Sequence, residues 1–529
     1  MIGTGWLVEN AKAKCRVLVI GLDAAEPSLL RRWAGAGLLP AIARAIASGA
    51  TRPLKLEPGL YAGSVWPSIF TGRSAGAHGR YNFLKLAPGS YAEERFTPAM
   101  LAVEPFWMRL SRAGLRSTLL DIPKMPLPDR FAGMLVSDWG THDPERPMTV
   151  LPADLAAEVA EVAGVDPVGS CDRFECRSPA RDELAAALCE RVRRRTDLAL
   201  HLLAKAPADL VFVTYTETHC GGHHLWAAHA RAGAAGRGDD PLANPYLRML
   251  QAIDAGIGRL RATVGDRTPL LILSSHGMGD HNDGTHLVDR ALRHLDGRGA
   301  RRGALRLAAG ALFRAHRHLP PGLADPLRPA LMRLIARAQA RDRAGRRWFQ
   351  VATNDNAAGV RVNLEGREPH GLVEPGPEFD RTLRLLRDRL LELENPTSGA
   401  PAFRAVLETR AAFAGGRVGE LPDLVLLWNR DHPFEALSAP WLGLVRGRYR
   451  GRRVGDHRGE GMLIAAAPGL VDDGTRPALT AMSVAPTITA ALGLPADGFE
   501  DAAFMPFVRA VRLAEPNPRE AAAAVADAV

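Results

Sequence analysis

Short apolar runs alternate along the chain with longer stretches in which apolar residues recur at helical spacing. The runs at 15–22, 209–214 and 270–273 are rich in Val, Ile and Leu, and each ends abruptly at polar or glycine residues. Runs this short and apolar are typical of parallel strands that are covered on both faces. Helices are expected at 28–49 and 245–264. The alternation predicts an α/β fold with a mostly parallel central sheet.

The same alternation resumes later in the chain after an interruption. Residues 287–347 are Arg- and Ala-rich helical material, which we interpret as an insertion packed on the core or a mobile lid. Further strands are expected at 358–364, 403–409, 423–428 and 461–466, and further helices near 376–393 and 484–493. The expected organisation is one interrupted domain: an N-terminal part (14–286), an insertion or lid (287–350), a C-terminal part (351–514) and a tail (515–529).

Polar residues with ligand chemistry follow three of the apolar runs. Asp23 follows the first run, His276 follows the run that ends near Leu273, and His219 and His223 follow the run that ends at Thr214. Ligands of open α/β sheets bind at the carboxyl ends of the strands. Two histidines four residues apart share one face of a helical turn, as metal ligation needs. The alternative for Asp23 is a cap on the helix that starts near Pro27.

Ser64 is the candidate nucleophile of the segment 62–72. A hydroxyl just before a short helix can attack an electrophile, because the helix N-terminus stabilises the negative charge that develops. The alternative is a serine that only caps the helix. His457 lies in a polar loop, 450–460, that precedes the strand at 461–466.

Composition narrows the function classes. The net charge of +9 is spread along the chain, without zinc-finger spacing or the aromatic pattern of RNA-binding domains. This charge indicates a solvated basic surface or attraction for anionic substrates. We expect an anionic small-molecule partner and no specific nucleic-acid binding. The odd number of cysteines, five, fits reduced thiols. Because no apolar leader precedes Arg16 and no long apolar segment occurs, we expect a cytoplasmic protein without a membrane span.

Taken together, these stretches resemble the alkaline phosphatase superfamily, and most closely its type I phosphodiesterase and nucleotide pyrophosphatase branch. The resemblance extends from Val17 to about Gly493. It rests on the order and strand-end position of six markers: GlyLeuAsp at 21–23, ThrGly with a following HisGly at 71–79, His219 to His223, SerSerHisGlyMet at 274–278, HisArgGlyGluGly at 457–461 and ValAlaProThrIle from 484.

The resemblance implies an alkaline phosphatase-like three-layer α/β/α sandwich, with the two parts of the chain forming one catalytic domain. It also implies two divalent metals, usually zinc, about 4 Å apart. Asp23 and His276 correspond to ligands of the first metal, and His223 and His457 to ligands of the second. The implied activity is metal-dependent hydrolysis of phosphate esters, with phosphodiester or pyrophosphate bonds expected. Sulfatase, phosphonate hydrolase and phosphomutase chemistry of the same superfamily are the alternatives.

Three positions depart from the family pattern. Ser275 replaces an aspartate ligand of the first metal, and His219 replaces an acidic ligand of the second. Ala62 occupies the usual position of the nucleophile, which leaves Ser64 as the nearest alcohol. Three histidines with an open position suit one zinc, so one or two ions are expected, with manganese as an alternative. The same departures keep open a catalytically impaired binding protein with this fold.

Overall fold

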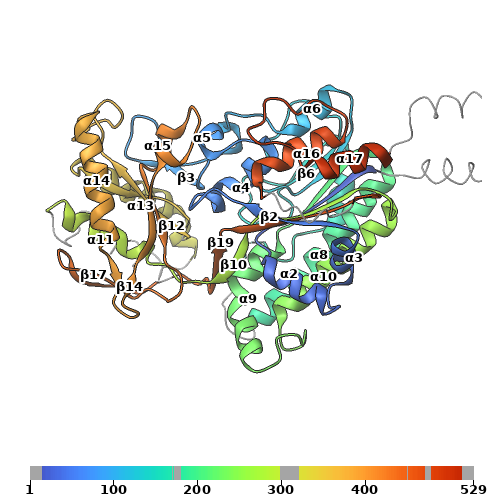
Figure 1. Ribbon diagram of the computed structural model, residues 1–529, viewed down its shortest axis with the longest axis horizontal. Helices are drawn as coiled ribbons and strands as arrows, with labels where there is room; N and C mark the ends of the chain where they lie inside the picture. The colour runs from blue at the N-terminus through green and yellow to red at the C-terminus, as the bar shows by residue number, and fades with distance from the viewer. Residues whose placement is uncertain are drawn as a thin grey trace, which may run out of the picture.

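The computed structural model describes residues 15–169, 171, 180–297, 312, 321–354, 356–449, 451–470 and 478–514, with side chains omitted for 321–329. A nine-stranded sheet forms its larger part (Figure 1). Its strands in spatial order are β21 (Leu479–Thr480), β2 (Gly49–Lys55), β20 (Glu460–Ala466), β9 (Leu270–Ser274), β1 (Cys15–Leu22), β8 (Ala208–Tyr215), β5 (Ser117–Leu120), β6 (Gly133–Ser137) and β7 (Thr149–Leu151).

The centre of this sheet is parallel, as the apolar runs predicted. Strand β1 pairs in parallel with β8 on one side and with β9 on the other, and Leu22 lies opposite both Tyr215 and Ser274. The chain therefore leaves all three strands at the same edge of the sheet. The residues that follow them, which include Asp23 and His276, are brought together there.

Helices cover both faces of the sheet, because successive β1 side chains point to opposite faces. Leu18, Ile20 and Leu22 pack into one core, whereas Val17 and Val19 pack into the other. The first core is covered by α2 (Pro27–Gly35), α3 (Pro40–Ala47), α7 (Ala156–Ala163), α8 (Ala180–Lys205) and α10 (Pro245–Val264), and the second by α4 (Tyr61–Thr71), α6 (Phe106–Arg112), α16 (Val484–Ala491) and α17 (Met505–Ala514). The three-layer α/β/α arrangement is thereby confirmed.

A second sheet lies beside the first, and its presence corrects one expectation. The strands expected near 358–364, 403–409 and 423–428 are present, but they form an antiparallel sheet of their own, in the order β11 (Trp348–Val351), β12 (Ala357–Val362), β16 (Leu424–Trp428) and β15 (Phe403–Glu408). Helices α11 (Thr285–Leu295) and α14 (Pro377–Leu391) share its core. A strand's apolar pattern does not specify which sheet the strand joins. The division of the chain at 287–350 stays a prediction.

Two smaller differences concern local structure. The helix expected at 28–49 is two helices, because Gly37 adopts a positive φ of 74° and Pro40 starts α3. His457 lies not in a loop but in β19 (Gly455–Arg458), which pairs antiparallel with β10 (Gly277–Asp280). Strand β19 lies between the two sheets (Figure 1).

The remaining elements connect these layers. They are α5 (Ala75–His78), β3 (Leu84–Leu86), β4 (Glu93–Arg95), α9 (Glu217–Ala234), α13 (Pro321–Ala344), β13 (Glu394–Asn395), β14 (Ala400–Pro401), α15 (Thr409–Ala412), β17 (Ala436–Ala439) and β18 (Gly443–Arg446). Among the described helices, none combines the length and apolarity that crossing a membrane requires. The expected tail at 515–529 lies outside the described residues.

Candidate metal centre

Three histidines from two distant segments meet at the carboxyl edge of the main sheet. His219 and His223 lie one turn apart on α9, which starts directly after β8, and His457 lies on β19. The Nε2 atom of His219 is 2.7 Å from Nε2 of His457 and 3.2 Å from Nε2 of His223. The structure therefore brings together the three histidines that the sequence assigned to one metal.

Hydrogen bonding orients these rings for metal binding. The Nδ1–H of His223 donates to the carbonyl oxygen of Gly455 at 2.8 Å, which leaves a lone pair on Nε2. The Nδ1 atoms of His219 and His457 are buried without a hydrogen-bond partner. One hydrogen can bridge only two of three converging Nε2 atoms, whereas a cation between them would satisfy all three. The donor set therefore fits a divalent metal.

The protonation state of the three rings also fits metal binding. Burial, followed by the charges of neighbouring cationic groups, holds the pKa values of His219, His223 and His457 well below the usual histidine range. Neutral imidazole is the form that ligates metals. At neutral pH each of these three rings is therefore neutral and has one nitrogen with a lone pair.

Asp23 and His276 lie beside this group, and Ser275 joins them. The Asp23 carboxylate accepts hydrogen bonds from Trp66 Nε1 at 2.7 Å and from the Ser275 hydroxyl at 3.0 Å. Its other oxygen is 3.6 Å from Nδ1 of His219. Asp23 does not cap α2, because the N-cap is Glu26.

His276 extends the cluster on its other side. Its Nδ1–H donates to the carbonyl of Gly277 at 3.1 Å, so its Nε2 carries a lone pair. Its ring centroid is 4.5 Å from that of His457 and 6.2 Å from that of His219. Burial lowers the pKa of His276, although the Asp23 carboxylate opposes the shift. His276 therefore offers a neutral nitrogen ligand beside the Asp23 carboxylate.

His142 is a neighbour that the sequence did not single out. Its ring lies 4.1 Å, centroid to centroid, from that of His219, and its ligand atom lies within 4.8 Å of those of His219 and His223. It follows β6 in a polar segment, Asp138–Asp143, in which Asp138 and Asp143 both have positive φ. Burial alone would lower the pKa of His142, but the charge of Asp143, 3.2 Å away, helps raise it to about 10. Its place after a strand end was the signal that could have identified it.

Ser64 is not brought into this cluster. Helix α4 starts at Tyr61, so Ser64 lies in its first turn, and the Ser64 hydroxyl donates to the Glu57 carboxylate at 2.9 Å. Ala62 and Gly63 line the cavity in its place. The helix therefore turns the serine toward a buried carboxylate and presents a methyl group to the site.

The cluster opens into a cavity of about 330 Å³ with several basic side chains. The cations are Arg80, Arg95, Lys124 and Arg453. Lys124 Nζ donates to the backbone carbonyl of Asp143 at 3.1 Å, which holds it near His142. None of the described residues that line the cavity carries a hydroxyl or thiol group. The cavity is therefore suited to an anion, and its described lining offers no hydroxyl or thiol nucleophile.

Buried ion pairs fix the elements that carry the histidines. Arg195 binds Asp121 at the end of β5, donates to the Gly140 carbonyl at 2.8 Å, and donates to Glu217 at 3.1 Å. Glu217 starts α9 and Gly140 precedes His142 by two residues. The Arg195 guanidinium thus joins the end of β5, the His142 loop and the helix that carries His219. Removal of one partner of such a buried ion pair typically lowers the free energy of unfolding by about 3–5 kcal/mol.

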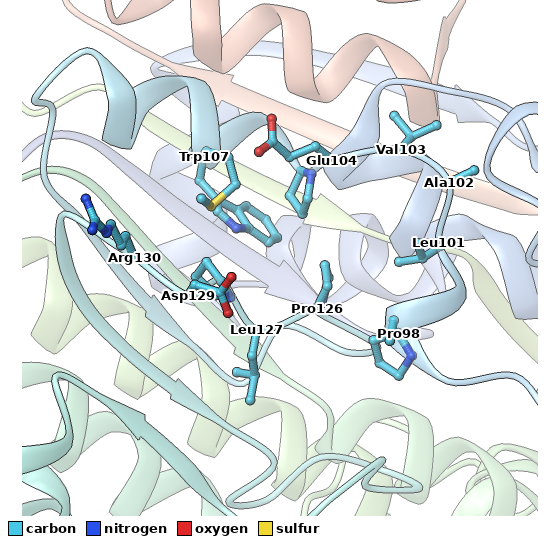
Figure 2. A pocket seen from close by; sticks show the side chains of 14 residues that line it. Pro98, Leu101, Ala102, Val103, Glu104, Trp107, Pro126, Leu127, Asp129 and Arg130 are labelled. Atoms are coloured by element: carbon cyan, nitrogen blue, oxygen red, sulfur yellow. The ribbon is translucent and has the colours of Figure 1, made fainter.

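A larger surface pocket of about 690 Å³ lies elsewhere, between residues 98–108 and 126–130 (Figure 2). It is lined mainly by proline and apolar residues around Trp107, with Glu104, Asp129 and Arg130 at its edges. It shares no lining residue with the histidine cavity and has no histidine or cysteine among its described lining residues. The candidate site is therefore the smaller, chemically equipped cavity.

Comparisons with known proteins identify the family and the fold. The profile of the type I phosphodiesterase / nucleotide pyrophosphatase family matches residues 17–433. No curated protein sequence matches the chain.

Two solved structures of one enzyme support the fold, and a third is similar at a lower score. Phosphonoacetate hydrolase from Sinorhizobium meliloti 1021 in complex with phosphonoformate superposes with a TM-score of 0.52 at 14% identity, covering 95% of this chain and 97% of that chain. The same enzyme with phosphonoacetate gives 0.52 at 13% identity, covering 95% and 97%. Murine ectonucleotide pyrophosphatase / phosphodiesterase 5 with AMP gives 0.48 at 13% identity, covering 94% and 99%.

Proposed function

The chain belongs to the type I phosphodiesterase / nucleotide pyrophosphatase family of phosphoric-ester hydrolases, and from this premise we propose that it hydrolyses phosphodiester or pyrophosphate bonds with the help of a divalent metal, zinc in the first instance. The observation that supports the proposal best is the meeting of His219, His223 and His457 beside Asp23 and His276 in a basic cavity. An anionic phosphoester would meet both metal ligands and cations there.

We assign the principal metal to His219, His223 and His457. Asp23 and His276 are the residues for a second, weaker position, because Ser275 supplies a hydroxyl in place of the family's carboxylate. A divalent ion held in this centre would supply positive charge to the phosphoryl oxygens as negative charge develops on them.

Basic side chains that line the cavity supply further positive charge near the substrate. Lys124 and Arg453 line the cavity and can pair with substrate oxygens, and Glu145 lies 2.7 Å from Arg80 and 3.5 Å from Lys124. Because no lining side chain supplies a hydroxyl or thiol, we assign the attack to water rather than to Ser64. The Nδ1–H groups of His223 and His276 donate hydrogen bonds to backbone carbonyls, and these bonds hold both rings in an orientation suited to metal binding.

The test uses the purified full chain with zinc or manganese and three nitrophenyl substrates: a phosphodiester, a phosphate monoester and a phosphonate ester. We expect the diester to turn over fastest, without an initial burst of nitrophenol, and a His223→Ala variant to lose this activity. Turnover of the diester with a stoichiometric burst would contradict attack by water. No turnover of any ester by metal-loaded protein would overturn the hydrolase proposal and favour the binding-protein alternative.

Phosphonate hydrolysis is the second candidate. It is supported by the basic cavity and by phosphonoacetate hydrolase among the similar structures, and faster release of phosphate from phosphonoacetate than of nitrophenol from the diester would favour it. For location we propose the cytoplasm, because the odd cysteine count fits a reducing compartment.

A further inference from the structure

A second cluster of metal-ligand residues shares His142 with the group of His142, His219 and His223. It comprises His142, Cys171 and Cys220, all buried. The three come from different segments: the loop after β6, the segment before α8, and α9. Neither cysteine lines the histidine cavity.

The distances within this cluster are those of donors that share a centre. Nδ1 of His142 is 3.2 Å from Sγ of Cys171 and 3.4 Å from Sγ of Cys220. All three ligand atoms lie within 4.8 Å of one another. In a tetrahedral zinc site, metal–ligand bonds of about 2.0–2.3 Å place neighbouring donors roughly 3.3–3.8 Å apart. Small side-chain adjustments, with loss of the proton that Asp143 and Cys220 favour on His142, would therefore admit an ion.

The charges around the cluster also suit a dication bound by thiolates. Two thiolates offset the charge of one divalent ion. Arg191 donates to Cys220 Sγ at 3.4 Å, and its own charge is met by Glu217 at 3.0 Å. A guanidinium N–H directed at sulfur favours the thiolate, which is the ligating form.

We propose that His142, Cys171 and Cys220 form a separate, soft-donor metal site that takes zinc. Cys171 and Cys220 are only 2% and 1% exposed, so substrate cannot reach this ion, and its role is structural. It would fix the segment of Cys171 to α9 and hold the ring of His142 beside His219. This site does not depend on the proposed hydrolase activity.

The test is cobalt substitution followed by absorption spectroscopy. Cobalt bound by thiolates gives a sulfur-to-metal charge-transfer band in the near ultraviolet, which nitrogen and oxygen ligands do not give. We expect the band in the wild-type chain, its loss in Cys171→Ser and in Cys220→Ser, and its retention in Cys189→Ser, the control on α8. A His457→Ala variant should keep the band while losing metal from the histidine centre.

Zinc analysis provides the second readout. Each cysteine variant of the cluster should bind one zinc fewer per chain than Cys189→Ser, and chelation should lower its melting temperature less than that of the wild type. Absence of the charge-transfer band in reduced wild-type protein would overturn the proposal. A Cys171–Cys220 disulfide in protein purified under reducing conditions would overturn it as well. If either Cys171→Ser or Cys220→Ser does not fold, the other variant still tests the proposal.

Discussion

The Nε2 atoms of His219 and His457 lie 2.7 Å apart although 238 positions separate the two residues in the chain. The order of strands explains this approach. His219 enters α9 directly after β8, whereas His457 lies on β19, whose partner β10 follows β9. Strands β8 and β9 both flank β1, so the two histidines come from opposite sides of one central strand.

This relationship predicts the metal content of a His457→Ala variant. Loss of one of three histidine ligands should weaken zinc binding by more than the roughly 10–100-fold that loss of an outer-shell partner costs. The measurement is zinc per chain after dialysis against a weak chelator. His201→Asn, which removes a histidine from α8 that bonds Glu158, is the control and should keep its metal. Equal metal content in both variants would refute the three-histidine assignment.

Ser64→Ala should affect stability and leave hydrolysis unchanged. The hydroxyl of Ser64 donates to buried Glu57 at 2.9 Å and that of Ser68 donates to the same carboxylate oxygen at 3.1 Å. Burial raises the pKa of Glu57, so we take the range for loss of an ordinary side-chain hydrogen bond, about 0.5–1.5 kcal/mol. We expect urea unfolding to show this loss in Ser64→Ala and in the matched Ser68→Ala, with kcat of both near wild type. A selective loss of kcat in Ser64→Ala would return the serine to the role of nucleophile.

The residues that were predictable from sequence are those that follow apolar strands. Asp23 and His276 could be placed at one edge because the strand before each is apolar on both faces. The pairing of β12, β15 and β16 into a separate antiparallel sheet was not predictable, because a strand's apolar pattern gives no information about its partner.

Side-chain direction is the second limit of sequence reasoning. Ser64 and Ala62 are two residues apart, yet α4 turns one toward Glu57 and the other toward the cavity. That difference depends on where the helix starts, and helix ends are the least predictable part of an element. His142 was missed because its partners, His219 and Cys171, are distant in sequence and show no motif spacing.

Lys124 should influence substrate binding more than protein stability. It lines the cavity, its Nζ donates to the Asp143 carbonyl, and burial lowers its pKa. We expect Lys124→Met to raise KM for an anionic diester about tenfold, which corresponds to about 1.4 kcal/mol of binding energy. Lys205→Met, at the end of α8, is the control. An unchanged KM, measured across a range of ionic strength, would exclude Lys124 from the substrate site.

Acid should destabilise the protein partly through His78. Nδ1 of His78 accepts from the backbone N–H of Arg80 at 3.1 Å and its Nε2–H donates to Ser68, so the ring is neutral. Burial, with the charge of Arg80, lowers the pKa of His78 from 6.5 to about 3. The unfolded chain therefore binds this proton more tightly, so the contribution is full above about pH 6.5 and is lost as the pH falls toward about 3.

The measurement for His78 is the free energy of unfolding between pH 7 and 5. The wild type should lose up to about 1.4 kcal/mol per pH unit from this residue, and His78→Gln should lack that part of the slope. Parallel slopes for the two proteins would mean that His78 has the same pKa in the folded and the unfolded chain.

Ser275→Asp should make stability depend more strongly on metal. The Ser275 hydroxyl lies 3.0 Å from a carboxylate oxygen of Asp23, so the substitution places two carboxylates side by side. Without metal they repel, and the melting temperature should fall below that of Ser275→Asn, the uncharged control. With saturating zinc the added carboxylate becomes a ligand beside Asp23 and His276, and each tenfold gain in affinity adds about 1.4 kcal/mol of stability. If zinc stabilises the Asp and Asn variants equally, no metal binds at this position, and the three histidines hold the only ion of the candidate centre.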